Sequence, residues 1–300
     1  MTYAAIDIGS NAVRLLFSNV YDGNPPIYRK SSLIRVPIRL GEDAFENHFI
    51  PPEKADILIK AISAFKILMD IHAPDSFMAC ATSAIREATN GGEIVDRIIK
   101  ETGIPVEVID GRREAEIIYS NHIAENLSDS SSYLYIEVGG GSTELTIFSG
   151  GEMIVSRTFA VGTVRMLKNK VARSEWNDLK EWVRFRTNGL DALTGIGSGG
   201  NINFLFKMLR RKEGKPLGVK KVKNMYQFLK SHTIDERITH LGLRPDRADV
   251  IIPALEIYLS VMKWAGITKI IVPNIGLADG IIHLLHERYL RSRDAERSSA

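Results

Sequence analysis

One short pattern occurs twice in this chain and restricts the fold more than any other feature of the sequence. Residues 4–18 (AAIDIGSNAVRLLFS) and 136–150 (IEVGGGSTELTIFSG) each read as an apolar strand with an acidic residue near its end, a loop containing glycine, and a second strand. The first strands align directly, whereas Leu15–Ser18 aligns with Thr146–Ser149 only if the second copy holds one extra residue. A repeat at this separation predicts two domains of like fold.

The loops of this repeat allow two interpretations. A glycine-rich hairpin can simply reverse the chain and do nothing chemical. Alternatively, the backbone N–H groups of Gly9–Asn11 and Gly139–Thr143 cradle phosphate oxygens, beside the strand-end carboxylates of Asp7 and Glu137. The second copy favours the phosphate interpretation, because two such loops facing each other in a cleft would suit a chain of phosphates with a divalent cation.

Length and composition agree with this interpretation. Three hundred residues suit two domains better than one core, and 44% hydrophobic with 25% charged residues is typical of a soluble globular protein. No apolar run is long enough to span a bilayer, and Asp7 interrupts any N-terminal signal sequence. The single cysteine, Cys80, excludes an internal disulfide. We therefore expect a cytoplasmic protein with no membrane partner.

The net charge of +3 is unevenly distributed. Between Lys207 and Lys223 lie eight basic residues and one acid, Glu213. Such a run is commonly a solvated loop, and its alternative is a surface that attracts an acidic substrate. No aromatic-rich stacking motif accompanies the run, so we do not expect a nucleic-acid partner.

Strands in a meander followed by strands alternating with helices predict an α/β fold in both halves, each a mixed sheet with helices around it. The strands are expected near 2–8, 12–20, 27–39, 76–81, 106–109, 133–139, 143–149, 152–160, 193–197 and 269–273. The helices are expected near 52–70, 92–102, 112–125, 162–169, 174–186, 199–210, 224–231, 235–241, 246–265 and 276–292. A Ser- and Asp-containing stretch at 124–133 is the best boundary, which predicts domains at 1–124 and 125–300.

Three further charged residues follow strand ends, where chemistry is commonly placed. Arg86 could match phosphate oxygens with its guanidinium fork or start a helix in water. Glu114 lies in a first helical turn, where acids ordinarily complement the helix dipole, but in a cleft it could take a proton from water. Arg165 begins a helix beside the second repeat. His283 and His286 have a helical ligand spacing but no third ligand near them in sequence, which argues against a metal role.

Together these segments resemble the exopolyphosphatase / guanosine pentaphosphate phosphohydrolase (Ppx/GppA) family of the actin-like ATPase superfamily. The blocks AIDIGSN, ATSAIREATNG, IDGRREAEIIY, EVGGGSTEL and VGTVRM occur in the family's order, and RLGE and GIGSGGNI look like two more. The resemblance covers nearly the whole chain. It implies two ribonuclease-H-like domains related by duplication, an active site in the cleft between them, and a terminal helix near 282–295 that packs back on the first domain.

The resemblance also implies a role for each matching residue. Glu114 would activate the attacking water, with Glu144 as a second catalytic acid, and Asp7 and Glu137 would lie near Mg²⁺ or another divalent cation, reached through waters. The phosphate-binding residues would be Gly9, Ser10, Asn11, Arg86, Gly139, Gly140, Gly141, Ser142, Thr143 and Arg165. Three departures stand out: Glu137 replaces an aspartate, Arg113 replaces the first acid of a Glu-Glu-Ala triplet, and Ala278 replaces an arginine.

The implied activity is release of terminal phosphate from inorganic polyphosphate, guanosine pentaphosphate or both, by in-line attack of water. The leaving group is itself a phosphate, so the protein must mainly neutralise charge and position the chain. Two alternatives stay open: a kinase of the same superfamily, and a sensor that binds polyphosphate or an alarmone without turnover. A homodimer is one option for the assembly.

Overall fold

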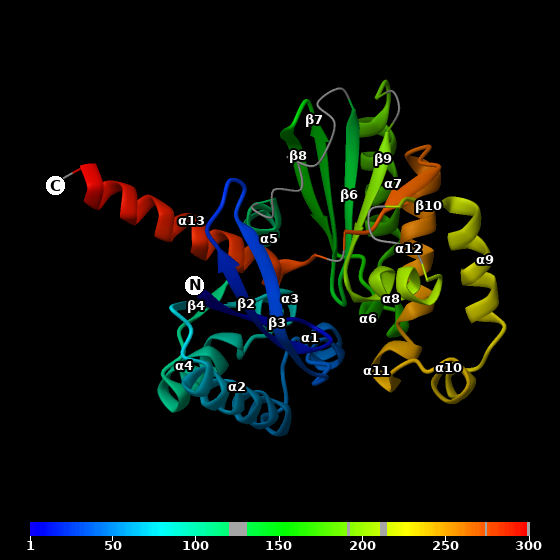
Figure 1. The fold of residues 1–300 in the computed structure, drawn as a ribbon. Coiled ribbons are helices and arrows are strands. Elements are labelled where there is room, and N and C mark those ends of the chain that lie inside the picture. Colours follow the sequence, from blue (N-terminus) through cyan, green and yellow to red (C-terminus); the bar gives the residue numbers. More distant parts are fainter. Residues whose placement is uncertain (120–130, 191–192, 211–214, 274, 299–300) are drawn as a thin grey trace. The chain divides into compact units, whose positions relative to one another are not determined.

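The computed structural model describes residues 1–119, 131–190, 193–210, 215–273 and 275–298. The chain divides into two compact units (Figure 1). Unit 1 comprises Met1–Asn121 and Ile275–Ala300, and unit 2 comprises His122–Asn274. The C-terminal segment therefore groups with the N-terminal unit by its contacts, whereas the sequence division placed all of 125–300 in the second domain.

Unit 1 contains a five-stranded mixed sheet in the order β3-β2-β1-β4-β5. The strands are β1 (Thr2–Ile8), β2 (Val13–Tyr21), β3 (Ile27–Val36), β4 (Ser76–Ala81) and β5 (Val106–Val108). The first three form an antiparallel meander, and β4 and β5 continue the sheet in parallel with β1. Its helices are α1 (Gly41–Asn47), α2 (Pro52–His72), α3 (Ser83–Glu87), α4 (Gly91–Thr102), α5 (Gly111–Tyr119) and α13 (Leu277–Ser298).

Unit 2 contains a six-stranded sheet in the order β10-β11-β9-β6-β7-β8. The strands are β6 (Ser132–Val138), β7 (Thr143–Ser149), β8 (Glu152–Phe159), β9 (Thr194–Ser198), β10 (Leu217–Gly218) and β11 (Lys269–Ile271). The helices are α6 (Thr163–Leu167), α7 (Arg173–Thr187), α8 (Gly200–Met208), α9 (Val219–Lys230), α10 (Ile234–Thr239), α11 (Pro245–Ala248) and α12 (Ile251–Trp264). No helix among the described residues is both long and apolar enough to cross a membrane.

The two sheets repeat the same topology. An antiparallel meander is followed by two parallel strands in each, so β1, β2, β3, β4 and β5 correspond to β6, β7, β8, β9 and β11. The predicted duplication is therefore present at the level of strand order. The short strand β10 is an addition that lies antiparallel to β11 at one edge of the second sheet.

The hairpin registers show that the two copies match without an insertion. Ile8 pairs with Val13 and Val138 pairs with Thr143, so each loop contains four residues. The prediction of one extra residue in the second copy is therefore wrong. The second strands differ at the second position after the loop, which is Arg14 in one copy and Glu144 in the other, so side-chain type alone does not reveal how they align.

Each meander also carries a register shift at the equivalent place. The shift lies between Phe17 and Ser18 in unit 1 and between Ile147 and Phe148 in unit 2. A β-bulge bends its strand and increases the local twist. The duplication therefore extends to this irregularity within the second strand of each meander.

Helix α13 covers one face of the first sheet. Alternate residues of β1 and β2, among them Tyr3, Ala5 and Leu16, form a buried cluster with Ile281 and Leu285 of this helix. Gly280 allows a close approach between helices, since a Cβ atom there would lie 2.1 Å from the carbonyl oxygen of Ile117 in α5. Contacts of this kind place the C-terminal helix in unit 1 and support α5.

Element boundaries differ from the sequence expectation in several places. The strand expected at 27–39 ends at Val36, and the short helices α1 and α3 were not anticipated. The helix expected at 246–265 is two helices, α11 and α12, and α9 begins at Val219 instead of 224. The helix expected at 112–125 is observed as α5, and its last six positions lie outside the described residues. Short helices carry too few periodic residues to be seen in sequence.

His286 of α13 makes the stability of unit 1 depend on pH. Its side chain is buried beside Tyr3, whose hydroxyl lies 3.4 Å from Nδ1, and its Nε2 atom finds no partner among the described residues. Burial lowers the pKa of His286 below its ordinary value of 6.5, and this effect outweighs the opposing attraction of Asp22 and Glu287. The unfolded chain therefore binds the proton more readily than the folded chain does.

We expect the free energy of unfolding to fall as pH is lowered through 6.5, because protons then favour the unfolded state. His286→Leu should flatten this part of the profile. The exposed histidine His240 provides the control variant, His240→Leu, which removes a histidine outside the buried cluster. Urea unfolding between pH 5 and pH 8 tests both variants, and equal slopes for wild type and His286→Leu would contradict the assignment.

Candidate active site

The glycine loop of unit 2, Gly139–Ser142, is held from one side by the start of α6. Three consecutive loop carbonyl oxygens accept hydrogen bonds from this helix. The bonds are Thr163 N to Gly139 O (3.0 Å), Val164 N to Gly140 O (2.9 Å) and Arg165 Nε to Gly141 O (2.7 Å). The side chain of Thr143 adds a bond to the carbonyl of Val161 just before the helix.

The loop of unit 1, Gly9–Ala12, is held in the same manner. The amide of Gly41 donates to the Ser10 carbonyl (2.8 Å), and the amide of Arg39 donates to the Asn11 carbonyl (3.1 Å). These donors follow the third strand of the sheet, as the start of α6 does in unit 2. Within each loop the first glycine closes the turn, Gly9 N to Ala12 O at 3.2 Å and Gly139 N to Ser142 O at 2.9 Å.

These bonds orient the loop amides. In a planar trans peptide unit the C=O of one residue and the N–H of the next point in opposite directions. The N–H groups of Gly140, Gly141 and Ser142 therefore face away from α6, and those of Asn11 and Ala12 face away from residues 39–41. Successive backbone N–H groups that point to one side form a concave site suited to an anion.

Gly162 is required for the tight contact in unit 2. A Cβ atom at this position would lie 2.4 Å from both the carbonyl oxygen of Gly140 and the carbonyl carbon of Gly141. Both atoms belong to the backbone, so the loop itself would have to move. The glycine that precedes α6 thus fixes the distance between the helix and the loop.

The acidic residue at the end of each first strand faces a different partner in the two units. Asp7 pairs across the hairpin with Arg14, and their side chains form an ion pair in which Asp7 is buried. Glu137 pairs across the equivalent hairpin with Glu144. Like charges directly opposite each other on antiparallel strands are unfavourable. Unit 2 therefore places two carboxylates where unit 1 places a carboxylate and a guanidinium.

Hydroxyl groups bind both carboxylates of the unit 2 pair. Tyr135 Oη donates to Glu137 at 2.9 Å, and Ser142 Oγ donates to Glu144. Burial and the neighbouring Glu137 charge raise the pKa of Tyr135 well above 10, so it stays a donor at neutral pH. The hydroxyl of Tyr258 ties the ends of β6 and β9 together through bonds to the carbonyls of Ile136 (3.2 Å) and Ser198.

The carboxylates fit a cation that keeps most of its water. The described part of the chain contains no group of three or more His, Cys, Asp or Glu side chains able to enclose a metal. Mg²⁺ commonly binds through one or two carboxylates, retaining several waters and contacting substrate phosphates. The Glu137–Glu144 pair has this donor chemistry, whereas the charge of Asp7 is already offset by Arg14.

The remaining predicted residues also lie next to the loops or strand ends. Arg86, at the end of α3, donates through Nη1 to the carbonyl of Ile109 (2.6 Å), which precedes α5. Glu114 lies half-buried in the first turn of α5, where its amide donates to the carbonyl of Asp110 (2.9 Å). Arg165 is buried, and its Nε bond to Gly141 makes it part of the loop's support.

The predicted residues thus form two sets, one in each unit. Unit 1 carries Asp7, the first loop, Arg86 and Glu114, and unit 2 carries Glu137, the second loop, Glu144 and Arg165. Each set gathers at the end of its own first strand. The expectation that both sets share one cleft stays a prediction.

Arg247 is a basic residue near the unit 2 set that the sequence did not single out. Its guanidinium carbon lies 5.4 Å from the ring centre of Phe204, and a Cβ atom on Gly200 would be 2.9 Å from its Nη2 atom. Gly200 starts α8, directly after the strand that pairs with β6. The arginine belongs to a different helix, α11, so no local pattern could link it to the glycine turn.

Two α/β units of the same topology, each with a glycine loop beside a strand-end acid, define a two-domain protein built from a duplicated α/β unit. The chain belongs to the Ppx/GppA phosphatase family, whose model matches residues 32–288. This family is one of hydrolases. The α/β fold class and the family predicted from the sequence are therefore confirmed.

The sequence is also similar to individual proteins of known name. The chain is 24% identical to Exopolyphosphatase 1 of Mycobacterium leprae over 99% of its own length and 91% of that protein. It is 27% identical to a bifunctional 3-dehydroquinate synthase/phosphatase of Fusobacterium nucleatum, over 90% of this chain but 44% of that protein. The chain therefore spans less than half of this second relative.

Solved structures share the fold. A Ppx/GppA family member from Aquifex aeolicus superposes with a TM-score of 0.75 at 24% identity, covering 96% of this chain and 98% of that chain. An exopolyphosphatase from Cytophaga hutchinsonii gives a TM-score of 0.80 at 24% identity, covering 95% and 97%. At 24% identity, the similarity to these two structures shows the fold of this chain.

Gly162→Ala should displace the unit 2 loop, because the added methyl group would overlap its backbone. We expect a loss of about 1–3 kcal/mol in stability, the usual cost of overpacking, together with weaker binding of tripolyphosphate. Gly92→Ala is the control, since a Cβ at that helical position meets nothing within 4 Å. Thermal unfolding and calorimetric titration with tripolyphosphate measure both effects, and wild-type binding by Gly162→Ala would show that the loop position is unimportant.

Proposed function

We propose that the protein hydrolyses the terminal phosphoanhydride bond of a phosphate chain, with inorganic polyphosphate as substrate and guanosine pentaphosphate as a second candidate. The observation that carries the proposal is the pair of loops whose carbonyls are tied back so that their amides can receive phosphate oxygens. Two exopolyphosphatases among the similar proteins support polyphosphate as the substrate class. The family includes phosphatases, which favours hydrolysis over transfer.

The chemistry asks for charge neutralisation and a positioned water. In unit 1, the Gly9–Ala12 loop holds phosphate oxygens and Glu114 takes a proton from the attacking water. In unit 2, the Gly139–Ser142 loop holds phosphate oxygens, with Arg247 as an additional cation beside α8. A phosphate leaving group needs little acid assistance. The carboxylates of Glu137 and Glu144 are therefore not needed as acids and are available for a cation.

We assign the cation to Glu137 and Glu144, with Mg²⁺ as the candidate ion. Support comes from their direct pairing across β6 and β7 and from the two hydroxyl donors that orient them. When bound, the ion would neutralise charge on the phosphate oxygens. Asp7, which the family resemblance placed near the cation together with Glu137, takes a supporting role in this proposal because it forms an ion pair with Arg14.

Two rivals use the same loops. A kinase of the superfamily would need ATP and an acceptor hydroxyl, and a sensor would bind the phosphate chain without turnover. A phosphate-release assay with long-chain polyphosphate, magnesium and no acceptor separates them, run beside guanosine pentaphosphate. Phosphate release supports the proposal, whereas binding without release would leave only the sensor.

Glu114→Gln should abolish turnover while leaving the fold and substrate binding largely intact. Loss of a general base costs about 10²- to 10⁴-fold in rate. Glu116→Gln is the matched control on the same helix, because the Glu116 carboxylate is occupied by ion pairs with Arg112 and Arg113. Steady-state kinetics on both purified variants decide, and a wild-type rate for Glu114→Gln would remove this residue from the mechanism.

Glu137→Gln and Glu144→Gln should each raise the magnesium concentration needed for half-maximal rate, because each removes one carboxylate from the proposed cation site. Asp7→Asn should raise it less, since Arg14 already balances that charge. The exposed acid Glu152 at the start of β8 serves as the control through Glu152→Gln. Magnesium titrations of activity test the series, and unchanged curves for both glutamate variants would mean that the pair serves the fold.

A further inference from the structure

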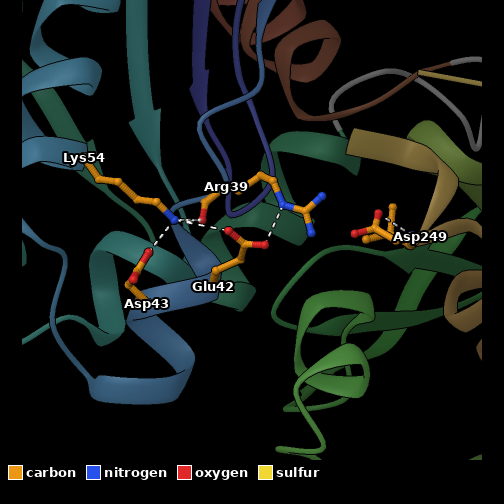
Figure 2. A network of polar contacts seen from close by, with 6 residues as sticks. Arg39, Glu42, Asp43, Lys54 and Asp249 are labelled. Carbon is orange, nitrogen blue, oxygen red and sulfur yellow. Dashed lines mark hydrogen bonds and ion pairs between the residues drawn. The ribbon is translucent and has the colours of Figure 1, made fainter. Parts of the chain in front are cut away.

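The segment that holds the unit 1 loop is itself held by one lysine. Lys54 of α2 extends its ammonium group between α1 and the end of the preceding turn (Figure 2). Nζ lies 3.2 Å from the carbonyl oxygen of Arg39 and 3.2 Å from Glu42 Oε2, and it also contacts Asp43. An ammonium group has three N–H donors, and each of them has an acceptor in this cluster.

Glu42 connects the lysine to the side chain of Arg39. Its Oε1 atom accepts from Arg39 Nε at 2.8 Å while Oε2 accepts from Lys54. Figure 2 shows the carboxylate lying between the two cationic groups. Arg39 is thus held at its backbone carbonyl and at its guanidinium by the same small cluster.

The backbone of Arg39 needs such support. Its φ angle is 60°, in the left-handed region that residues with a side chain rarely adopt. This turn presents the amides of Arg39 and Gly41 to the carbonyls of Asn11 and Ser10. Residue 41 must be glycine for the same approach, because a Cβ there would lie 3.0 Å from Ser10 Cβ and 2.6 Å from the ring of Phe45.

We propose that Lys54 is a positioning residue for phosphate binding: by holding Arg39 in its left-handed turn, it orients the peptide planes of the Gly9–Ala12 loop. The chain of contacts runs from Lys54 to the Arg39 carbonyl, from the Arg39 and Gly41 amides to the loop carbonyls, and across each peptide plane to the Asn11 and Ala12 N–H groups. Lys54 acts through these residues and not by touching the substrate. The proposal rests on the proposed function of the loop.

The cluster is suited to this task because it is sheltered. The side chains of Arg39, Glu42, Asp43 and Lys54 are between 21% and 29% exposed. Ion pairs at this depth are screened by salt less than surface pairs are. By contrast, Lys66 on the same helix forms a solvent-exposed ion pair with Asp70, in which the two side chains are 42% and 60% exposed.

The test compares Lys54→Met with Lys66→Met, which removes an ion-paired lysine from the same helix without touching the loop. We expect Lys54→Met to weaken binding of tripolyphosphate about tenfold and to raise the KM for polyphosphate by a similar factor. Lys66→Met should bind as wild type does. Lys54→Arg, which restores a cationic donor, should recover most of the affinity.

Isothermal titration with tripolyphosphate and steady-state kinetics give separate readouts, and thermal unfolding reports on stability. If Lys54→Met lowers the melting temperature but binds tripolyphosphate normally, the lysine only joins α1 to α2 and the proposal is overturned. If Lys54→Met and Lys54→Arg lose affinity equally, orientation by a cationic donor is also overturned. A wild-type protein that binds tripolyphosphate but releases no phosphate would contradict the hydrolase assignment alone, because the binding comparison still decides the role of Lys54.

Discussion

The planarity of the peptide bond controls what both glycine loops can do. A loop carbonyl that accepts a hydrogen bond on one side forces the next N–H group to the other side. In unit 2 the start of α6 donates hydrogen bonds to three consecutive loop carbonyls, and in unit 1 the Arg39–Gly41 turn donates hydrogen bonds to two. Each loop thereby gains a set of oriented donors without any side chain of its own, which explains why small residues are sufficient there.

The two units share this backbone device but differ in charge. Position for position, the ion pair of Asp7 and Arg14 in one hairpin corresponds to the carboxylate pair of Glu137 and Glu144 in the other. The first pairing sets opposite charges against each other, whereas the second sets like charges against each other. The two units therefore share the backbone geometry of the loop but differ in their strand-end charges.

Much of the fold was readable from the sequence because it depends on local patterns. Alternating apolar residues and glycine turns located the strands, and the repeat predicted two like domains. The short helices α1 and α3 were missed because one or two turns give no periodicity. The division of 246–265 into α11 and α12 was missed because α11 has only four residues, too few to show a helical period of their own before the apolar residues of α12 begin.

Part of the candidate site could be recognised in the sequence for the same reason, namely that it depends on local patterns. Glu114 follows a strand end and Glu144 lies at the start of β7, and each carries chemistry that can be recognised within its own sequence block. Tyr135 is four residues before the loop, yet its bond to Glu137 depends on the side of the strand that it occupies. Arg247 and Lys54 lie far from both loops in sequence, and their roles come from helix packing alone.

The sequence by itself determined the duplicated strand-loop-strand unit, the α/β class and the identity of the family blocks, since each of these depends on residues close together in the chain. Tertiary structure decided which groups meet: the pairing of Glu137 with Glu144 and the support of each loop by a segment from beyond the third strand. The physical reason is distance along the chain. Local spacing fixes which side of an element a residue faces, but only the packed fold brings a lysine of α2 to the turn that orients a loop more than forty residues earlier.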